Sequence, residues 1–93
     1  MFIEKDVKNM IIEVLKNIQR VSGYESESIS GTTNPFKDLE GFDSQISVAA
    51  ICELSTSLDI DIPDNANIFL SGDGKRRLTI DEIAGRVCKI LNK

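Results

Sequence analysis

Few side chains in this 93-residue sequence have the types and spacing that support chemistry. The segment Gly72–Lys75 is glycine-rich and basic, but a phosphate-binding loop would need a glycine at Phe69 and a hydroxyl at Arg76. The acidic run Asp59–Asp64 lacks the central glycine and the bidentate glutamate of a calcium-binding loop. Histidine is absent, which removes the commonest general base of a catalytic triad. The sequence therefore predicts no catalytic residue and no metal ligand.

A serine that follows a long loop and begins a helix is the remaining candidate for chemistry. It lies at the end of the segment Gly41–Ser44. Asp43 is of a residue type that commonly caps a helix N-terminus, which would make Ser44 the first helical residue. By itself this pair is a weak indication of function, because both residues are common at helix starts. The elements around the pair therefore decide how it is interpreted.

A helix and a long loop precede this serine. Apolar residues recur with helical spacing from Ile3 to about Arg20, which predicts an amphipathic helix that ends before Gly23. Residues 22–42 are rich in Ser, Gly, Thr, Asn and Pro without periodicity, which predicts a loop of a length that is commonly functional. Its isolated apolar residues are expected to cover one end of a helical core: Ile29, Phe36 and Leu39.

A second helix is predicted from Asp43 to about Leu58. Its apolar stripe is expected to consist of Val48, Ile51, Leu54 and Leu58, with Ala50 beside them. Residues 59–64 alternate polar and apolar side chains, which is a pattern typical of a strand. We expect an extended turn there instead, because no other segment offers a partner strand.

The last third of the chain predicts one short and one long helix. One or two helical turns are expected over Ala66–Leu70, ending at the turn residues 71–74. A longer helix is predicted after Thr79, which forms a capping box with Glu82. The predicted fold is thus all-α: a single domain over residues 1–93 with three main helices, one short helix and a long loop between the first two.

Composition narrows the possible partners and surroundings. The chain has 15 acidic and 11 basic residues, a net charge of −4 that would repel nucleic acid backbones. Cys52 and Cys88 are too few for a disulfide framework or a zinc site, so we expect two reduced, partly buried thiols. No stretch resembles a signal peptide or has transmembrane length. We therefore expect a cytoplasmic protein with no nucleic acid partner and no membrane insertion.

Three segments together resemble the acyl carrier protein family. They are residues 39–44 (Leu-Glu-Gly-Phe-Asp-Ser), residues 58–64 (Leu-Asp-Ile-Asp-Ile-Pro-Asp) and residues 78–83 (Leu-Thr-Ile-Asp-Glu-Ile). The interval from Ser44 to Pro63 is similar to the family's interval without a gap. The resemblance covers nearly the whole chain, and its middle third is the specific part.

The resemblance implies that Ser44 carries a covalent 4′-phosphopantetheine arm, transferred from coenzyme A by a phosphopantetheinyl transferase. It also implies that Asp43 helps to hold magnesium during the transfer, and that the thiol of the arm carries an acyl group as a thioester. The protein would then be a non-catalytic, monomeric carrier that an acyl ligase or acyltransferase loads for its pathway enzymes. An apolar slot for the acyl chain is expected between the helices, lined by Ala50, Leu54, Leu58 and Ile62.

Physical chemistry is consistent with an anionic group on Ser44. The first residue of a helix faces backbone N–H groups that have no intrahelical partner, and it lies at the positive end of the helix dipole. Such a placement contributes about 0.3–1 kcal/mol when it is exposed. The long loop before the serine leaves room for an arm to move.

The residues after Ser44 depart from the family pattern. Gln45 stands where the family usually has Leu or Met, and Ile46 stands where typical bacterial fatty-acid carriers have an acidic residue. Only Asp43 and Glu53 are acidic between residues 43 and 58, although the family docks on basic partner surfaces through the acidic face of this helix. The face expected to dock partners consists of Gln45, Ile46, Ala49, Cys52 and Glu53.

These departures leave several functions open. The depleted acidic face favours a dedicated carrier for a specialised lipid or other acyl-transfer pathway over a housekeeping carrier of fatty-acid biosynthesis. Phe42 and Asp43, together with residues 60–64, favour an acyl cargo, and an aminoacyl cargo stays open. Ile46 either makes an apolar contact with a partner or packs at the loop edge. The alternative outside this class is an unmodified interaction module, for which Gln45 is the supporting residue.

Overall fold

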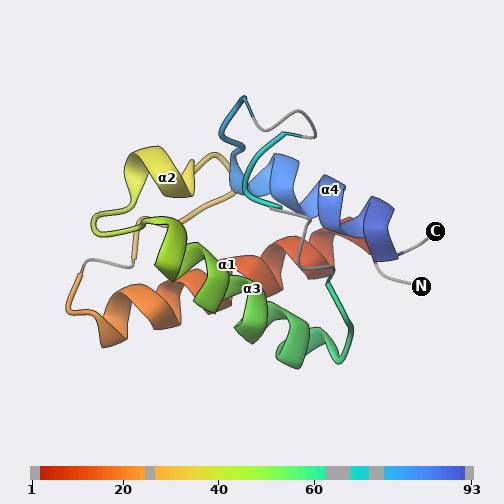
Figure 1. The fold of residues 1–93 in the computed structure, drawn as a ribbon, viewed down its shortest axis with the longest axis horizontal. Coiled ribbons are helices and arrows are strands. Elements are labelled where there is room, and N and C mark those ends of the chain that lie inside the picture. Colours follow the sequence, from red (N-terminus) through yellow and green to blue (C-terminus); the bar gives the residue numbers. More distant parts are fainter. Residues whose placement is uncertain (1–2, 25–26, 63–67, 72–74, 92–93) are drawn as a thin grey trace.

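A computed structural model describes residues 3–24, 27–62, 68–71 and 75–91 of the chain. These residues contain four helices: α1 (Glu4–Val21), α2 (Pro35–Asp38), α3 (Ser44–Leu58) and α4 (Ile80–Leu91) (Figure 1). Within the same ranges, strand-like pairing is limited to one isolated antiparallel bridge between Leu70 and Arg77. The predicted all-α bundle of three main helices and one short helix is confirmed.

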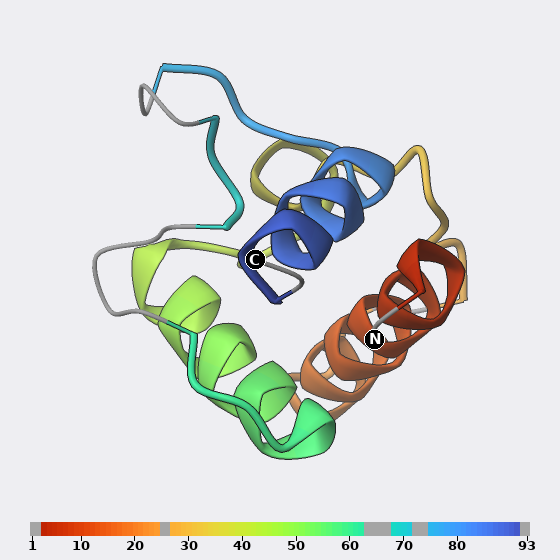
Figure 2. The same ribbon diagram turned by 90° about the vertical axis from the view of Figure 1, so that its right-hand side faces the viewer.

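The long helix α1 packs against both α3 and α4 (Figure 2). Its buried face consists of Val7, Ile11, Val14, Leu15 and Gln19, which recur at helical steps of three and four. The helix closes on Gly23, whose φ of 83° is the left-handed conformation that glycine adopts readily. The N–H of Gly23 donates to the carbonyl of Arg20 and the N–H of Tyr24 to that of Gln19, as in a Schellman motif. The predicted end of this helix is confirmed.

The buried face of α3 differs from the predicted stripe. Ser47, Ala50 and Leu54 are buried, whereas Val48 is 59% exposed. Ile51 and Leu58 are partly buried against the core. The prediction was wrong for Val48 because the apolar residues of α3 surround much of the helix, so their spacing does not fix which side faces the core. A buried serine thus takes the place that the sequence pattern gave to a valine.

The short helix lies elsewhere than predicted. It is α2, inside the loop of residues 22–42, where Pro35 provides the fixed φ that suits the first helical turn. In the described part of Ala66–Leu70, Ile68 and Phe69 form a turn and Leu70 enters the bridge with Arg77, so the predicted helical turns are wrong there. Residues 66 and 67 lie outside the described residues.

The end of α3 is followed by a turn, as predicted for residues 59–64. Asp59 takes the left-handed conformation (φ 54°), and the N–H of Ile60 donates to the carbonyl of Ser55. No strand forms over residues 59–62, the part of this segment that the structure describes. Pro63 and Asp64 lie outside the described residues.

Backbone hydrogen bonds join the long loop to the start of α4. The N–H groups of Ile80 and Asp81 donate to the carbonyls of Thr33 and Gly31, each over 2.9 Å. These contacts satisfy N–H groups that have no partner within the helix. A Cβ at Gly31 would meet the carboxylate of Asp81, so that side chain would have to shift to admit one. The loop is therefore ordered where it crosses α4, although it has little helix of its own.

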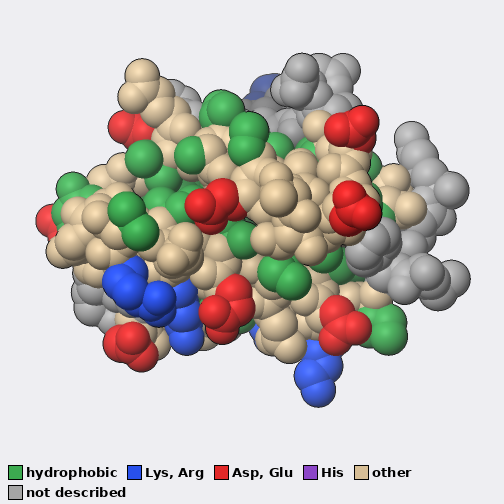
Figure 3. Space-filling model, turned by 90° about the horizontal axis from the view of Figure 1, so that it is seen from below, with side chains coloured by type: hydrophobic (Ala, Val, Ile, Leu, Met, Phe, Trp, Pro, Cys, Tyr) green, Lys and Arg blue, Asp and Glu red, His purple; other side chains and the backbone are tan. Residues whose placement is uncertain are grey.

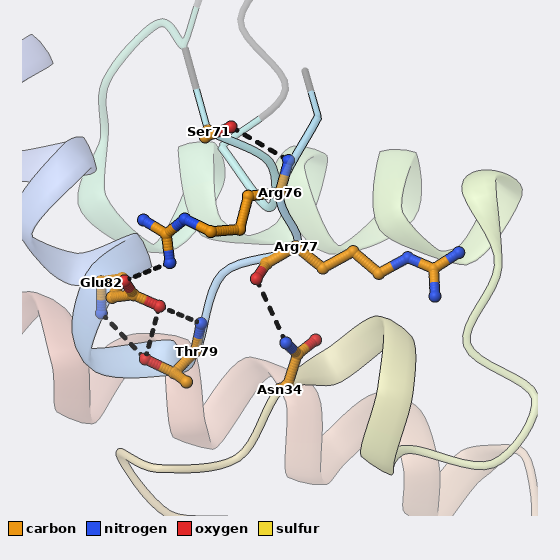
Figure 4. A network of polar contacts seen from close by, with 6 residues as sticks. All are labelled: Asn34, Ser71, Arg76, Arg77, Thr79 and Glu82. Atoms are coloured by element: carbon orange, nitrogen blue, oxygen red, sulfur yellow. Dashed lines mark hydrogen bonds and ion pairs between the residues drawn. The ribbon is translucent and has the colours of Figure 1, made fainter. Parts of the chain in front are cut away.

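The predicted capping box at the start of α4 is confirmed. The N–H of Thr79 donates to Oε1 of Glu82 over 3.0 Å, and the N–H of Glu82 donates back to Oγ1 of Thr79 over 3.4 Å (Figure 4). The guanidinium of Arg76 adds an ion pair to Glu82 at 2.6 Å.

Among the described residues, no helix is long and apolar enough to cross a membrane.

Glu82 makes the stability of the fold depend on pH. Its hydrogen bond from the backbone N–H of Thr79, and then the bond from Arg76, lower the pKa of Glu82 from its ordinary value. A carboxyl with a lowered pKa stabilises the folded state above its ordinary, unfolded-state pKa and loses that contribution as the pH falls through the lowered, folded-state pKa. We expect Glu82→Gln to be less stable than the wild type at pH 7, and the difference to shrink by pH 3.

Urea unfolding followed by far-UV circular dichroism at the two pH values measures this difference. Glu13→Gln, which removes an exposed carboxylate on α1, is the matched control. A constant difference between the wild type and Glu82→Gln at both pH values would contradict the role of the ionised carboxylate.

Candidate functional site

The candidate site is the N-terminus of α3, where Ser44 is the first helical residue. Asp43 lies before it in extended conformation, and its Oδ1 accepts hydrogen bonds from the N–H groups of Gln45 and Ile46, both over 3.0 Å. The predicted cap is therefore confirmed. Asp43, Gln45 and Gly41 are all exposed, so the chain on either side of Ser44 is open to solvent.

This cap corrects one expectation about the helix terminus. From the sequence alone, an anionic group on Ser44 is expected to face backbone N–H groups without partners. Two of those N–H groups, from Gln45 and Ile46, already donate to Asp43. The carboxylate of Asp43 thus occupies the positive end of the helix dipole, and a second anion beside it would experience like-charge repulsion.

An aromatic cluster fixes the chain immediately before this cap. The rings of Phe36, Phe42 and Phe69 meet edge to face, with centroid distances of 5.1 Å (Phe36–Phe42), 5.3 Å (Phe42–Phe69) and 6.2 Å (Phe36–Phe69). Such pairs contribute about 0.5–1.5 kcal/mol beyond the area they bury. Phe42 directly precedes Asp43 and is only 7% exposed. The cluster therefore holds the residue that leads into the candidate site.

The C-terminal end of α1 also contacts the approach segment, which is residues 40–42 directly before the cap. Gln19 is 2% exposed, and its Nε2 donates to the backbone carbonyl of Glu40 over 2.9 Å. Gly41 has a φ of 73°, and a Cβ there would come within 2.5 Å of the ring of Tyr24. Sequence reasoning missed Gln19, because a polar residue on an apolar face has no pattern that identifies its partner.

The residues predicted to dock partners lie on the outer side of α3. Gln45, Ala49, Cys52 and Glu53 are exposed, and Ile46 is half-buried. The exposed Val48 joins this group and adds to its apolar character. Figure 3 shows apolar and acidic side chains interspersed on the lower face of the molecule, with a group of basic side chains on its left and another basic side chain at its lower right. Helix α3 itself contains no Lys or Arg and one carboxylate, Glu53.

The residues predicted to line an acyl slot are brought together in the core. Ala50, Leu54 and Ile62 are buried, and Leu58 packs against the same cluster. Their neighbours in that cluster include buried residues of α1 and α4. The four positions thus contribute to one continuous apolar interior, and their role toward a cargo stays a prediction.

The two cysteines differ in their surroundings. Both thiols are free; Cys52 is exposed on α3, so the expectation of a partly buried thiol is wrong there. Cys88 is half-buried, and burial, followed by the negative charge of Glu4, raises the pKa of its thiol. A raised pKa keeps the thiol protonated, which makes Cys88 a poor nucleophile at neutral pH.

Comparisons of the chain with protein-family models, curated proteins and solved structures found no match. The function of this protein therefore has to be argued from the geometry of the site and from the sequence motifs around it.

The capping role of Asp43 can be measured as stability. We expect Asp43→Ala to lower the free energy of unfolding by about 0.5–2 kcal/mol, because the N–H groups of Gln45 and Ile46 lose their acceptor. Asp43→Asn should change it by only a few tenths of a kcal/mol, since an amide oxygen still accepts both bonds. Urea unfolding followed by circular dichroism measures both variants, with the exposed Asp61→Ala as control. An Asp43→Ala variant as stable as the wild type would contradict the cap.

Proposed function

We propose that this protein is an acyl carrier that bears 4′-phosphopantetheine on Ser44 and performs no catalysis of its own. The observation that carries the proposal is a serine at the first position of a 15-residue helix, directly after a capping aspartate, in a small all-α bundle. The acyl-carrier-like motifs at residues 39–44, 58–64 and 78–83 support the same function. We infer a cytoplasmic monomer as its working form.

The surroundings of Ser44 fit a transfer reaction carried out by a partner enzyme. Gly41, Asp43 and Gln45 are exposed, so a transferase can approach the helix terminus from solvent. Phe42 is held by the aromatic cluster and Glu40 by Gln19, so the approach segment keeps its position. A serine on a fixed backbone suits modification better than one in an unordered segment, because less ordering is needed when the transferase binds.

Asp43 has a second role in this proposal besides capping. Its carboxylate is exposed and lies next to the serine that would receive the phosphodiester. Two neighbouring negative charges favour a divalent cation between them, and carboxylate and phosphate oxygens are the ligands that Mg²⁺ prefers. We infer that Asp43 supplies one oxygen ligand to magnesium during the transfer.

When bound, the phosphopantetheine group would supply a thiol that holds an acyl group as a thioester. The chain's contribution would be to position the arm and to shelter an apolar cargo between α3 and the rest of the core. Because Ala50 and Leu54 are each 2% exposed, entry of an acyl chain requires α3 to move away from its neighbours. A cargo that stays outside, along the exposed face of α3, needs no such movement.

The outer face of α3 favours a dedicated pathway over a housekeeping role. With Glu53 as its one carboxylate and Val48 exposed, this face would attract a strongly basic partner surface only weakly. An apolar contact through Ile46, Val48 and Cys52 suits partner enzymes with a complementary apolar surface. We therefore infer a specialised lipid or other acyl-transfer pathway, with its own loading ligase or acyltransferase.

The exposed Val48 also favours a second candidate function, an interaction module without the arm. Exposed apolar residues that gather on one helix face often mark a protein-binding surface. Such a module would bind through the same face of α3 and would not need the hydroxyl of Ser44. Modification of Ser44 separates the two functions.

Intact-protein mass spectrometry after incubation with coenzyme A, Mg²⁺ and a broad-specificity phosphopantetheinyl transferase tests the proposal. We expect a single phosphopantetheinyl addition to the wild type and none to Ser44→Ala. Asp43→Asn should keep the cap and slow the addition by about tenfold or more, if the lost charge removes a metal interaction of about 1.4 kcal/mol.

Equal modification of the wild type and Ser44→Ala would contradict the proposal. The absence of modification with several transferases would also contradict it. In that case, the same assay on Gln45→Leu tests whether Gln45 is what prevents modification. Modification of Gln45→Leu under conditions that leave the wild type unmodified would favour the interaction module.

A further inference from the structure

A basic hollow lies between α4 and the segment that leads into it. Its described lining includes Ser71 and Arg76 from the segment before α4, and Glu82, Arg86 and Lys89 from the helix. Residues 82, 86 and 89 follow one another at steps of four and three, so they share one face of α4. The bridge between Leu70 and Arg77 brings the preceding segment beside this face (Figure 4).

Positive charge exceeds negative charge in this hollow. Three cations line it, Arg76, Arg86 and Lys89, against the one carboxylate of Glu82. Glu82 is already engaged, because it pairs with Arg76 at 2.6 Å and accepts the N–H of Thr79. The carboxylate of Glu4 approaches Gly85 nearby, and the cations still outnumber the carboxylates when it is included. Arg86 and Lys89 form no ion pair with any described residue.

The guanidinium of Arg86 carries the most specific observation. Its Nε is buried, and it has no hydrogen-bond acceptor among the described residues. A buried N–H without an acceptor is rare in folded proteins, because the group loses its hydrogen bond to water without gaining another. A guanidinium presents its N–H groups in a planar fork that matches the oxygens of phosphate. Because Arg86 lines the hollow, an anion bound there would meet the outer N–H groups of this fork.

We propose that this hollow binds a phosphate group, held by Arg86 and Lys89 with Arg76 at its edge. Arg76 is positioned by its ion pair to Glu82 and by the bond from its own N–H to Oγ of Ser71 over 3.1 Å. Phosphate suits the hollow because a dianion matches the two cations that have no carboxylate partner. The site is distinct from Ser44, and the proposal does not rest on the carrier function.

The source of the phosphate group is either inorganic phosphate or an organic phosphate ester. Both share the oxygens that a guanidinium recognises, and an ester adds a body that the hollow would also contact. Titration with inorganic phosphate and, separately, with glycerol 3-phosphate distinguishes them. Tighter binding of the ester would assign the site to an organic phosphate, and tighter binding of inorganic phosphate would assign it to the free ion.

Two-dimensional ¹H–¹⁵N NMR at constant ionic strength, set with sodium chloride, is the measurement. We expect saturable shifts in the millimolar range at the amides of residues 82–89 and at the Nε–H of Arg86. Arg86→Gln and Lys89→Gln should each weaken binding about tenfold or more, since each removes a charged hydrogen bond. Arg20→Gln, which removes an exposed arginine in the last turn of α1, should bind as the wild type does.

Two results would overturn the proposal. One is the absence of saturable shifts in the wild type with either probe. The other is an unchanged dissociation constant in both Arg86→Gln and Lys89→Gln. The exposed Lys89 keeps the test valid if Arg86→Gln fails to fold, and thermal unfolding followed by circular dichroism shows whether it folds.

Discussion

The fold depends on the apolar face of α1, which packs against α3 and α4 at the same time. Val7, Ile11, Val14 and Leu15 are all buried on that face. Each such side chain contributes about 1.5–3 kcal/mol when it is fully removed from water. A domain of this size has one small core, so few of these contacts are replaceable. The two helices that carry the candidate sites, α3 and α4, are thus positioned by a third helix that carries neither.

The segments between the helices owe their order to a few specific contacts. Carbonyls of Gly31 and Thr33 accept the first N–H groups of α4, and Gln19 holds the carbonyl of Glu40. The aromatic cluster then fixes Phe42 at the entrance to α3. Apart from the pair of Phe36 and Phe42, these contacts join residues that lie more than twenty positions apart in the sequence. Together they turn a loop with one short helix into a defined path that ends at Ser44.

Local signals in the sequence predicted the helices and their termini well. Asp43 caps α3, Gly23 closes α1, and Thr79 with Glu82 begins α4, because each depends on residues within a few positions of the terminus. The side of α3 that faces the core was predicted wrongly at Val48, since apolar residues occur around much of that helix. The position of the short helix was also predicted wrongly, because Leu70 pairs with Arg77, seven positions later, instead of ending a helical turn.

The candidate sites show the same division between local and tertiary information. The cap by Asp43 was predictable from the sequence. The structure shows that it takes the N–H groups of Gln45 and Ile46, so an anion added at Ser44 would meet the Asp43 carboxylate instead of free donors. The aromatic cluster was not predicted, although it contains three of the four phenylalanines in the sequence. The basic hollow was also missed, because Ser71 and Arg86 come together only in the folded chain.

The proposed function predicts that the protein already carries its phosphopantetheine group when it is isolated from the cell. The decisive measurement is mass spectrometry of the protein isolated from cells that make it, with fragmentation of the peptide that contains Ser44. The carrier function predicts a phosphopantetheine group on Ser44 and, in part of the sample, an acyl group that hydroxylamine removes. A chain that is isolated uniformly without any group on Ser44 would contradict it.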